Sequence, residues 1–334
     1  MADKMEYFPV VAILGGGQLG SRHLQALSLV LQQMEIWVID PSEESRTTAR
    51  QRWEEVAGET GRRHNVRFAE NTSGLPHRVD VAIIATNADV RRPVTEALLA
   101  GHELGAVVFE KVLFPAEADY AAVSRLLRAN RVSAWVNCPR RIWKSYQSLK
   151  ERIGNRRVYS LEASGSLWGL GCNSIHMVDL LVWITSACNI KVDHVKLSPE
   201  IIPAKRAGFV EFTGVMVGHT DKGSMFSFSA WPTAGIPFTL KITAENLVAE
   251  IREDEGKAWV ATSDNNWVWC EESVHQEFQS QLTHTVVEKI IRGEDPGLTP
   301  YEESVQLHLP LILAFLDHLK TARNQSWLSE CPIT

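Results

Sequence analysis

Cysteine is scarce in this chain. The 334 residues include five cysteines, an odd number, and none of them stands in a C-x-x-C pair. This count and spacing argue against a disulfide framework and a structural zinc site, and they favour a reducing cytoplasm. The histidines form no H-x-x-x-H pattern and no cluster with cysteine, so we expect no metal centre.

Long apolar runs and an excess of positive charge are also missing. No uninterrupted apolar stretch reaches membrane-spanning length, and residues 1–9 contain no apolar signal region. The net charge of −6 argues against a protein held to nucleic acid by phosphate contacts and against a polybasic membrane anchor. The hydrophobic fraction of 45% and the charged fraction of 22% are ordinary for a globular protein. We therefore expect neither a nucleic-acid nor a membrane partner.

What the chain does contain, close to its start, is a strand, a glycine-rich turn and a helix. Residues 10–14 are an apolar run, and leucines then recur at helical spacing. Between them, Gly15, Gly17 and Gly20 have the G-x-G-x-x-G spacing of a dinucleotide-binding fingerprint. Such glycines permit a tight turn, a close approach to a pyrophosphate and close packing of the helix on the strand. With the helix N-terminus, they predict cofactor contacts at Gly15, Gly17, Gln18, Leu19 and Gly20.

The acidic residue that such a fold requires is also present. A second predicted strand, residues 36–39, ends in Asp40, twenty residues after Gly20. An acid at this place accepts a hydrogen bond from the adenosine ribose and repels a 2′-phosphate, which favours NAD. Ser42 and Arg46 follow closely, so NADP use stays open.

The first part of the chain alternates strands and helices. Further apolar strands are predicted at 65–69, 79–86, 106–109 and 132–136, with helices at 41–58, 90–100 and 116–130. This order predicts a doubly wound parallel sheet, in which ligands lie outside the carboxyl ends of the strands. At those ends we expect Thr86, Asn87, Glu110 and Lys111 to contact the cofactor.

The pattern changes after Pro139. Helices are predicted at 140–153, 172–185, 277–292 and 301–322, and most of the segment between 192 and 269 reads as strands with turns. We therefore predict an α/β Rossmann domain at 1–138 and an α+β domain at 139–334 with a large, mainly antiparallel open-faced sheet. Helices would cover one face of this sheet, and a partner subunit would bury the other.

Several motifs in series resemble the Gfo/Idh/MocA oxidoreductases, which include glucose–fructose oxidoreductase and inositol dehydrogenase. G-G-G-Q-L-G-S-R-H carries the fingerprint with His23 three residues on, and A-I-I-A-T-N is similar to the fourth strand of the family. F-E-K-V stands where the family has E-K-P, which places its lysine at Lys111. G-L-G-C-N-S-I-H-M-V-D-L resembles D-x-G-x-H-x-x-D, which places its histidine at His176 and its later aspartate at Asp179.

The chain also departs from the family pattern. Val112 replaces the proline after Glu110 and Lys111, and Cys172 replaces the acid four residues before the histidine. Asn173 is the nearest polar substitute for that acid, and Asn173, His176 and Asp179 remain candidates for substrate binding.

The resemblance implies hydride transfer between NAD(P) and a secondary alcohol or ketone of a sugar, polyol or sugar nucleotide. This reaction needs a base for the hydroxyl proton and a group that holds the alkoxide. The positive end of a helix disfavours imidazolium, so we predict His176 as the base and Lys111 as the polarising group. The reverse assignment stays open. The structural alternatives are a lysine paired with Glu110 and a core histidine partnered by Asp179.

Two further residues are candidates for substrate contact. Arg141 could bind a phosphate or carboxylate, or belong to a solvated basic helix start. Trp168 could stack on a sugar ring, although tryptophan in this half serves mainly in packing or interfaces.

Two classes of function therefore stay in view. The first is an NAD(P)-dependent dehydrogenase or reductase acting on CH–OH groups, assembled as a homodimer or homotetramer through the open sheet. The second is a non-catalytic nucleotide-binding protein, a redox sensor or assembly partner, which the replacement of the acid by Cys172 would favour. A lyase that uses bound NAD transiently would share the same residues.

Overall fold

The computed structural model describes residues 7–334, and the chain divides into two compact units. The first unit contains the chain up to residue 113 together with 121–137 and 277–298, and the second contains 114–120, 138–276 and 299–334. The predicted domain boundary after residue 138 lies one residue from a point where the chain leaves the first unit for the second. The segment 277–298 falls within the range predicted for the second domain, but it belongs to the first unit.

The first unit is built on a parallel sheet with the strand order β6-β5-β4-β1-β2-β3. In the central strand, Val11 pairs with Ile36 on one side and with Val81 on the other. All five residues of this strand are buried, as the continuous apolar run predicted. The strands are β1 Val10–Leu14, β2 Glu35–Ile39, β3 Asn65–Ala69, β4 Arg78–Ile84, β5 Glu103–Phe109 and β6 Ser133–Val136.

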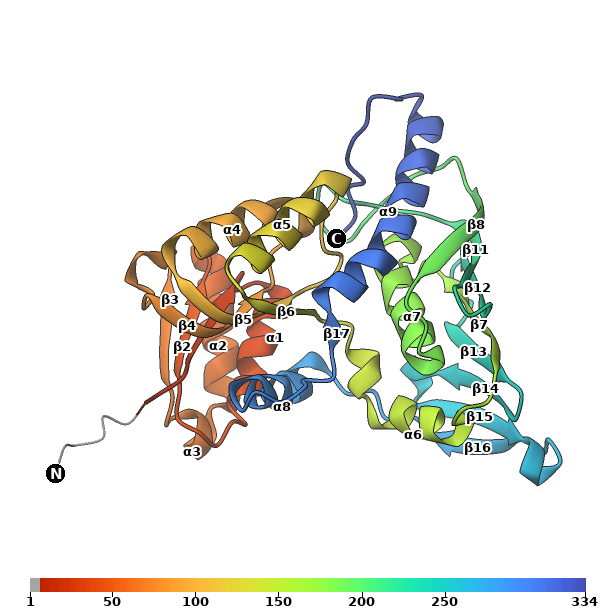
Figure 1. Cartoon of the computed structure of the whole chain (residues 1–334), viewed down its shortest axis with the longest axis horizontal. Helices are drawn as coiled ribbons and strands as arrows, with labels where there is room; N and C mark the ends of the chain where they lie inside the picture. Colours follow the sequence, from red (N-terminus) through yellow and green to blue (C-terminus); the bar gives the residue numbers. More distant parts are fainter. Residues whose placement is uncertain (1–6) are drawn as a thin grey trace. The chain divides into compact units, whose positions relative to one another are not determined.

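Helices lie on both faces of this sheet (Figure 1). Helix α8 comes from the far end of the chain and packs along α1. The N-terminus of α2 is capped by Ser42, whose side chain accepts a hydrogen bond from the Ser45 N–H. The helices are α1 Gln18–Leu27, α2 Glu43–Val56, α3 Gly58–Gly61, α4 Ala88–Gly101, α5 Glu117–Ala129 and α8 Gln279–Ile291, with a 3₁₀ turn η1 at Thr72–Gly74.

The second unit is built on a larger sheet with the order β16-β15-β14-β13-β7-β12-β11-β8. Only the pair β7 and β12 is parallel among these neighbours, and the others are antiparallel. Its strands are β7 Val158–Ser166, β8 Ile190–Leu197, β11 Gly214–Thr220, β12 Met225–Trp231, β13 Thr239–Ala244, β14 Leu247–Arg252, β15 Lys257–Thr262 and β16 Cys270–Ser273. The short strands are β9 Ile202–Pro203, β10 Val210–Glu211 and β17 Thr299–Pro300.

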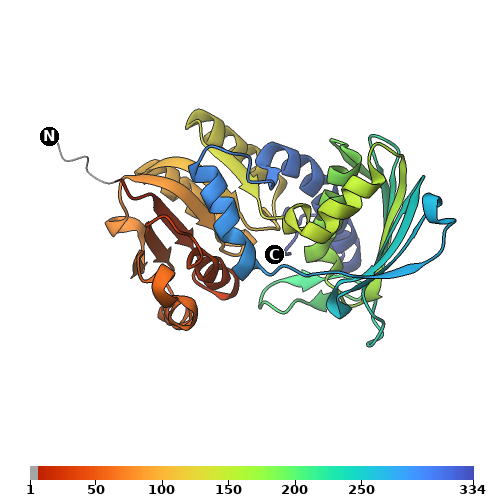
Figure 2. The same cartoon turned by 90° about the horizontal axis from the view of Figure 1, so that it is seen from below.

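One face of this larger sheet is covered by helices and the other is bare. Figure 2 shows helices on one side, and no helix of residues 7–334 lies on the other. Side chains along β12 alternate between the two faces in the same way. Phe226 and Phe228 are fully buried under the helices, and Ser227 and Ser229 are partly exposed on the bare face. The helices are α6 Lys144–Ile153, α7 Leu170–Thr185 and α9 Tyr301–Arg323, with 3₁₀ turns η2 Pro139–Ile142, η3 Glu253–Glu255 and η4 Ser263–Asn265.

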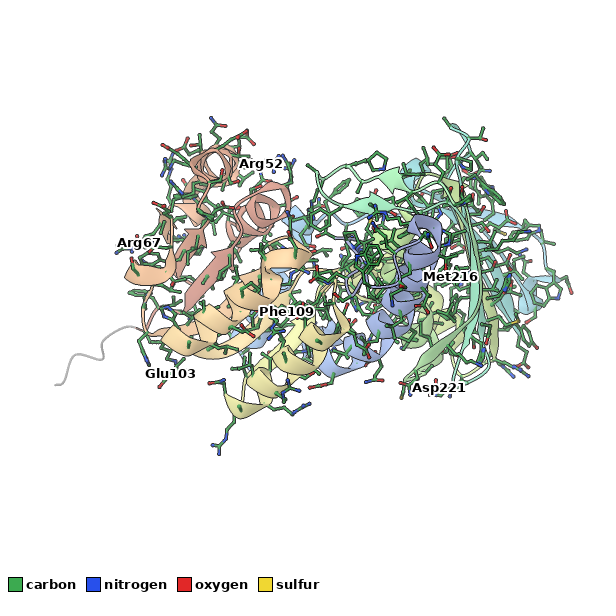
Figure 3. All side chains as sticks on the ribbon, turned by 90° about the horizontal axis from the view of Figure 1, so that it is seen from above. Arg52, Arg67, Glu103, Phe109, Met216 and Asp221 are labelled. Atoms are coloured by element: carbon green, nitrogen blue, oxygen red, sulfur yellow. The ribbon has the colours of Figure 1, made fainter. Side chains whose placement is uncertain are left out.

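Each unit has its own apolar core. Phe109 lies inside the first unit and Met216 inside the second, whereas Glu103 and Asp221 lie at the surface (Figure 3).

Two predicted elements differ from the structure. The helix expected at 140–153 is interrupted at Trp143, whose extended backbone separates η2 from α6. The strand-like segment predicted to run up to residue 269 ends in a turn instead, because Asn266 and Trp267 adopt φ angles of 50° and 59°, and β16 begins only at Cys270.

Candidate functional site

The glycine-rich turn leaves no room for side chains where the strand meets the helix. A Cβ atom on Gly20 would lie 1.7 Å from the Gly15 carbonyl oxygen, and one on Gly15, at φ 95°, would lie 2.9 Å from the Ala85 carbonyl carbon. A Cβ on Gly17 would meet no atom within 4 Å, so the backbone there faces open space. Gly17 is also the N-cap of α1 and gives no side-chain cap, and no acid stands in the first turn. The N–H groups of that turn, from Gln18 and Leu19 onward, suit an anion.

Asp40 links the glycine turn to the start of α2. Its Oδ2 accepts the Gly16 N–H at 2.7 Å, and its Oδ1 accepts the Ser42 N–H at 2.8 Å. Each carboxylate oxygen has a second lone pair, so the group can still accept a ribose hydroxyl. Arg46 donates to the Asp40 backbone carbonyl oxygen at 2.6 Å, which places its guanidinium against the backbone of the same residue.

Thr86 and Asn87 follow the end of β4, next to the glycine turn. The Thr86 hydroxyl is buried and has no hydrogen-bond partner within residues 7–334. Asn87 is the exposed N-cap of α4, yet its side chain makes no capping hydrogen bond. A buried hydroxyl without a partner is costly, so this edge of the sheet has polar groups suited to a ligand.

Glu110 follows β5, and its side chain turns into the interior of the first unit. Its carboxylate is almost fully buried, and its Oε1 lies 2.9 Å from His23 Nε2 and 2.5 Å from Asn137 Nδ2. Burial alone would raise the pKa of Glu110, but His23, Asn137 and the charge of Lys111 outweigh it and hold the pKa below its ordinary value. The carboxylate is therefore an anion inside the unit, and the half-buried Lys111 follows it.

In the second unit, the first turns of α7 carry the other candidates. Cys172, Asn173 and His176 are all half-buried. Glu211 of β10 accepts the Gly171 N–H at 2.7 Å and the Cys172 N–H at 3.1 Å. A carboxylate thus lies on the N-terminus of α7, where it opposes the positive end of the helix dipole. Nothing in the local sequence indicated Glu211.

Trp168 is anchored within the second unit. Its Nε1 donates to the Ser229 carbonyl oxygen at 2.9 Å, and its ring centroid lies 5.2 Å from that of Phe238 and 6.3 Å from that of Phe228. Asn173 Nδ2 donates to the Trp168 carbonyl oxygen at 2.7 Å. The indole is half-buried, so only part of the ring is open to a ligand.

Arg141 and Asp179 face each other in the core of the second unit. Arg141 Nε lies 2.7 Å from Asp179 Oδ2 and Arg141 Nη2 lies 2.8 Å from Asp179 Oδ1, and the two side chains are 6% and 0% exposed. Thr299 donates a further hydrogen bond to Asp179, and Glu303 pairs with Arg141. This geometry favours a structural role for both residues over direct contact with substrate.

The alternative of a solvated basic helix start is wrong for this segment. Arg140 is also paired, through Nε and Nη2, with both carboxylate oxygens of the buried Glu253. Its guanidinium lies over the ring of Trp143. Both arginines are therefore held in ion pairs with buried carboxylates of the second unit, Asp179 on α7 and Glu253 in η3.

The candidate residues thus gather in two sets. The first unit brings the glycine turn, Asp40, Thr86, Asn87 and Lys111 to the carboxyl ends of its strands, and turns Glu110 inward. The second unit brings Trp168, Asn173 and His176 to the start of α7, with Arg141 and Asp179 buried. Lys111 and His176 belong to different units.

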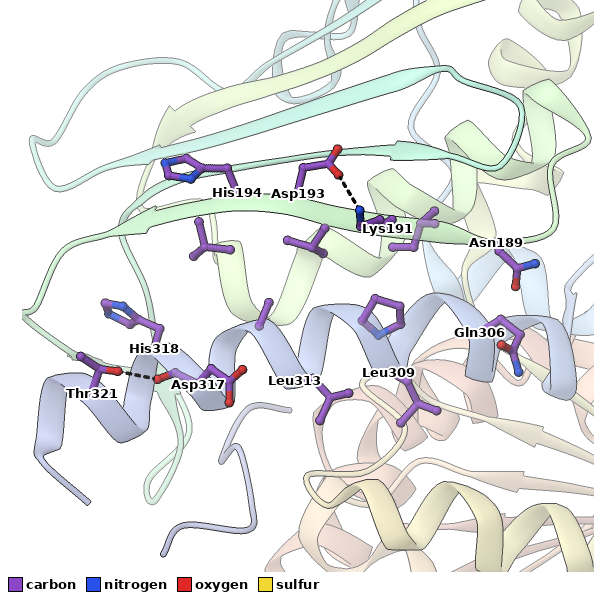
Figure 4. Close-up of a pocket in the computed structure, with 15 residues that line it drawn as sticks. Asn189, Lys191, Asp193, His194, Gln306, Leu309, Leu313, Asp317, His318 and Thr321 are labelled. Carbon is purple, nitrogen blue, oxygen red and sulfur yellow. Dashed lines mark hydrogen bonds and ion pairs between the residues drawn. The ribbon is translucent and has the colours of Figure 1, made fainter. Parts of the chain in front are cut away.

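A separate groove of about 780 Å³ lies within the second unit between β8 and α9 (Figure 4). Its walls include Leu309, Leu313 and His318 of α9, with the ion pair of Lys191 and Asp193 on β8. It contains none of the candidate residues.

No cluster of three or more His, Cys, Asp or Glu side chains in residues 7–334 is placed to hold a metal ion. Among the helices of that range, none combines the length and apolar character needed to cross a membrane. The cysteines at 138, 172, 188, 270 and 331 are free thiols.

Solved structures share this architecture, although no protein-family model and no curated protein sequence matches the chain. An oxidoreductase from Agrobacterium radiobacter, solved with NAD+, L-tartaric acid and magnesium, has a TM-score of 0.68 at 12% identity, over 95% of this chain and 98% of that one. UDP-N-acetylglucosamine 3-dehydrogenase GnnA from Acidithiobacillus ferrooxidans has a TM-score of 0.68 at 14% identity, over 95% and 99%. GenD2 from gentamicin A biosynthesis, solved with NAD, has 0.66 at 17%, over 93% and 94%. This likeness confirms the predicted fold class, a Rossmann sheet with a large open-faced sheet.

Proposed function

We propose that the chain is an NAD-dependent oxidoreductase of the Gfo/Idh/MocA type. It would transfer a hydride between nicotinamide and a secondary alcohol or ketone of a sugar, polyol or sugar nucleotide. The observation that carries the proposal is the glycine turn, closed to any side chain at Gly15 and Gly20, open at Gly17, and joined to Asp40 through the Gly16 N–H. Neighbours with the same fold include a sugar-nucleotide dehydrogenase and proteins solved with NAD.

The first unit would hold the cofactor. The backbone at Gly15, Gly17, Gln18, Leu19 and Gly20 suits the pyrophosphate. Asp40 would bind the adenosine ribose, and Thr86 and Asn87 would contact the part of the cofactor nearer the nicotinamide. When bound, NAD supplies the hydride acceptor.

The chemical step assigns one role to each of two residues. An alcohol that loses a hydride must also lose its hydroxyl proton, and the oxygen carries negative charge on the way. His176 would take the proton as an imidazole, and the Lys111 ammonium would stabilise the oxygen. Asn173 and Trp168 would bind the substrate. The opposite assignment, with Lys111 as the base, predicts that added imidazole does not restore activity to His176→Ala.

The test begins with calorimetric titration of the purified protein with NADH and, separately, NADPH. We expect tight binding of NADH and weaker binding of NADPH. The protein is then supplied with NAD and a panel of sugars, polyols and sugar nucleotides, and NADH formation is followed by absorbance. Binding without turnover of any of them would favour the non-catalytic nucleotide-binding alternative. Absence of binding, in protein first shown to contain no nucleotide, would contradict the proposal.

Asp40→Ala is expected to weaken NADH binding about 10- to 100-fold, since hydrogen bonds to charged groups contribute about 1.5–3 kcal/mol. It should also relax discrimination against NADPH, because the repelling carboxylate is gone and Arg46 remains nearby. Calorimetry with both cofactors measures the two effects. Asp295→Ala, an exposed aspartate of the same unit, is the matched control. Unchanged selectivity in Asp40→Ala would remove Asp40 from the cofactor site.

The open face of the large sheet would join two copies of the chain. Ser229 lies on this open face between Val215 on one side and Ser164 on the other, and Met225 and Trp231 of the same strand are exposed on it. We expect a dimer or tetramer in light scattering, and we expect Ser229→Arg to shift it towards the monomer with an unchanged far-UV circular dichroism spectrum at low temperature. A wild-type protein that is monomeric at micromolar concentration would contradict this assembly.

A further inference from the structure

A buried polar cluster in the first unit is left unexplained by cofactor binding. Its members are His23 of α1, Glu110 after β5, Asn137 after β6, and Gln279 and Thr283 of α8. His23, Glu110, Asn137 and Thr283 are all at most 5% exposed. Two segments distant in sequence, at His23 and Asn137, therefore contact the Glu110 carboxylate, and a third, α8, contacts those two residues.

The hydrogen bonds form a continuous chain through this cluster. Glu110 Oε1 meets His23 Nε2 at 2.9 Å and Asn137 Nδ2 at 2.5 Å. His23 Nδ1 lies 2.8 Å from Thr283 Oγ1, Gln279 Nε2 donates to that hydroxyl at 2.6 Å, and Asn137 Nδ2 also meets Gln279 Oε1 at 2.7 Å. The partners of Glu110 are thus themselves held in place by α8.

The backbone around Glu110 is fixed as firmly as its side chain. The Glu110 N–H donates to the Ile84 carbonyl oxygen at 3.0 Å, and the Asn137 N–H donates to the Phe109 carbonyl oxygen at 2.8 Å. The next residue is Lys111, whose charge acts on the Glu110 carboxylate. A buried anion is costly unless it is paired and hydrogen-bonded, and this one has both kinds of partner.

We propose that Glu110 is a positioning residue for the reaction: clamped by His23 and Asn137, its carboxylate fixes Lys111 and holds a negative charge beside the ammonium. It is not a cofactor ligand. This rests on the proposed function, in which Lys111 acts on the substrate oxygen. It also assigns α8 an indirect role in the site, because Thr283 and Gln279 hydrogen-bond to His23 and Asn137, the two residues that contact Glu110.

The first test compares Glu110→Gln with Glu103→Gln. Glu103 is an exposed glutamate at the other end of the same strand, so it is a matched control. We expect Glu110→Gln to lower kcat about tenfold or more, because small misplacements of a reacting group are costly. The Kd for NADH should stay within about twofold, since the carboxylate does not touch the cofactor. A loss of NADH affinity equal to the loss of kcat/KM would overturn the proposal and make Glu110 a cofactor ligand.

The second test needs no activity. Reductive methylation of lysines by formaldehyde and cyanoborohydride is followed by mass spectrometry of the peptide that contains Lys111. We expect Lys111 to react severalfold faster in Glu110→Gln than in the wild type or in Glu103→Gln, because the amine has lost its neighbouring charge and its fixed position. An unchanged rate would overturn the proposal. If the wild type turns over no substrate while labelling responds as expected, the positioning stands and the proposed function fails.

A smaller substitution in the same cluster tests the proposal with less disturbance of the fold. Thr283→Val removes only the hydroxyl beside His23 Nδ1, and we expect it to change labelling and kcat in the same direction by a smaller factor. The control for a buried histidine is His64→Gln, in the same unit, which should leave both readouts unchanged. An equal response in His64→Gln would show that the effects come from general destabilisation and would overturn the assignment.

Discussion

Replacing Lys111 by methionine is expected to lower kcat about 10²- to 10⁴-fold, the range typical of a positioned acid, base or polarising group. Methionine keeps an apolar stem of similar length, so the change removes mainly the ammonium. The Kd for NADH should stay within about twofold, because a group used in the transition state contributes to kcat more than to cofactor binding. Initial rates of NADH formation and calorimetry measure the two quantities.

Lys289→Met is the matched control, because Lys289 is a partly exposed lysine on α8 of the same unit. We expect its kcat to equal that of the wild type. A Lys111→Met variant that keeps more than a tenth of the wild-type kcat would exclude Lys111 from the chemical step. His176→Ala should lose activity to a similar extent, and partial rescue by added imidazole would identify His176 as the base.

The first unit was predictable because its signals are local. A parallel strand is buried on both faces, so residues 10–14 appear as a continuous apolar run and fold as the whole of β1. The glycine spacing was informative for a similar reason: backbone atoms approach too closely at Gly15 and Gly20 for any other residue. Asp40 follows β2 directly, and the register of a parallel sheet brings it beside the turn.

The position of α8 was not predictable in this way. Its apolar spacing predicts a helix near 277–292, but spacing does not say which surface the helix covers. The chain returns to the first unit there, and the buried Leu282, Val286 and Val287 lie on the helix that packs along α1. The role of α8 is shown by the hydrogen bonds of Gln279 and Thr283 with the buried cluster around Glu110. Both residue types are ordinary on a helix surface, so the sequence does not mark them.

The missing acid of α7 shows a second limit. The sequence has Cys172 where the resemblance implies a carboxylate, and this replacement removes that carboxylate from α7 itself. The structure brings Glu211 to the Cys172 N–H from a strand 39 residues further along the chain. Gly171 has the room for it, since a Cβ there would lie 3.0 Å from Glu211 Oε2. The start of α7 therefore still has a carboxylate, that of Glu211, although Cys172 itself carries none.

Buried ion pairs are a third kind of structural feature that the spacing of residues in the sequence does not reveal. Arg141 resembled a surface or substrate-binding arginine because charged residues are rarely buried. Its partner Asp179 lies on another helix, and their pairing depends on how η2 packs against α7. The same holds for Arg140 and Glu253, which are 113 residues apart.

The Arg141 pair leads to the largest expected effect on stability. Arg141→Ala should lower the free energy of unfolding by about 3–5 kcal/mol, because it leaves the fully buried Asp179 without its main counter-charge. Arg152→Ala breaks a pair with Glu272 in which both side chains are more than a third exposed, and should cost no more than about 1 kcal/mol. Urea unfolding followed by tryptophan fluorescence compares the two variants with the wild type.

The pH dependence distinguishes a stranded charge from a simple loss of packing. Burial already raises the pKa of Asp179 above its ordinary value, and removal of Arg141 should raise it further. An acid whose folded pKa is raised weakens the folded state above that pKa, and the penalty shrinks as the pH falls through it. The destabilisation of Arg141→Ala should therefore be smaller at pH 5 than at pH 7, and the double variant Arg141→Met with Asp179→Leu should recover most of the loss. Equal losses at both pH values would instead assign the effect to the packing of the arginine stem.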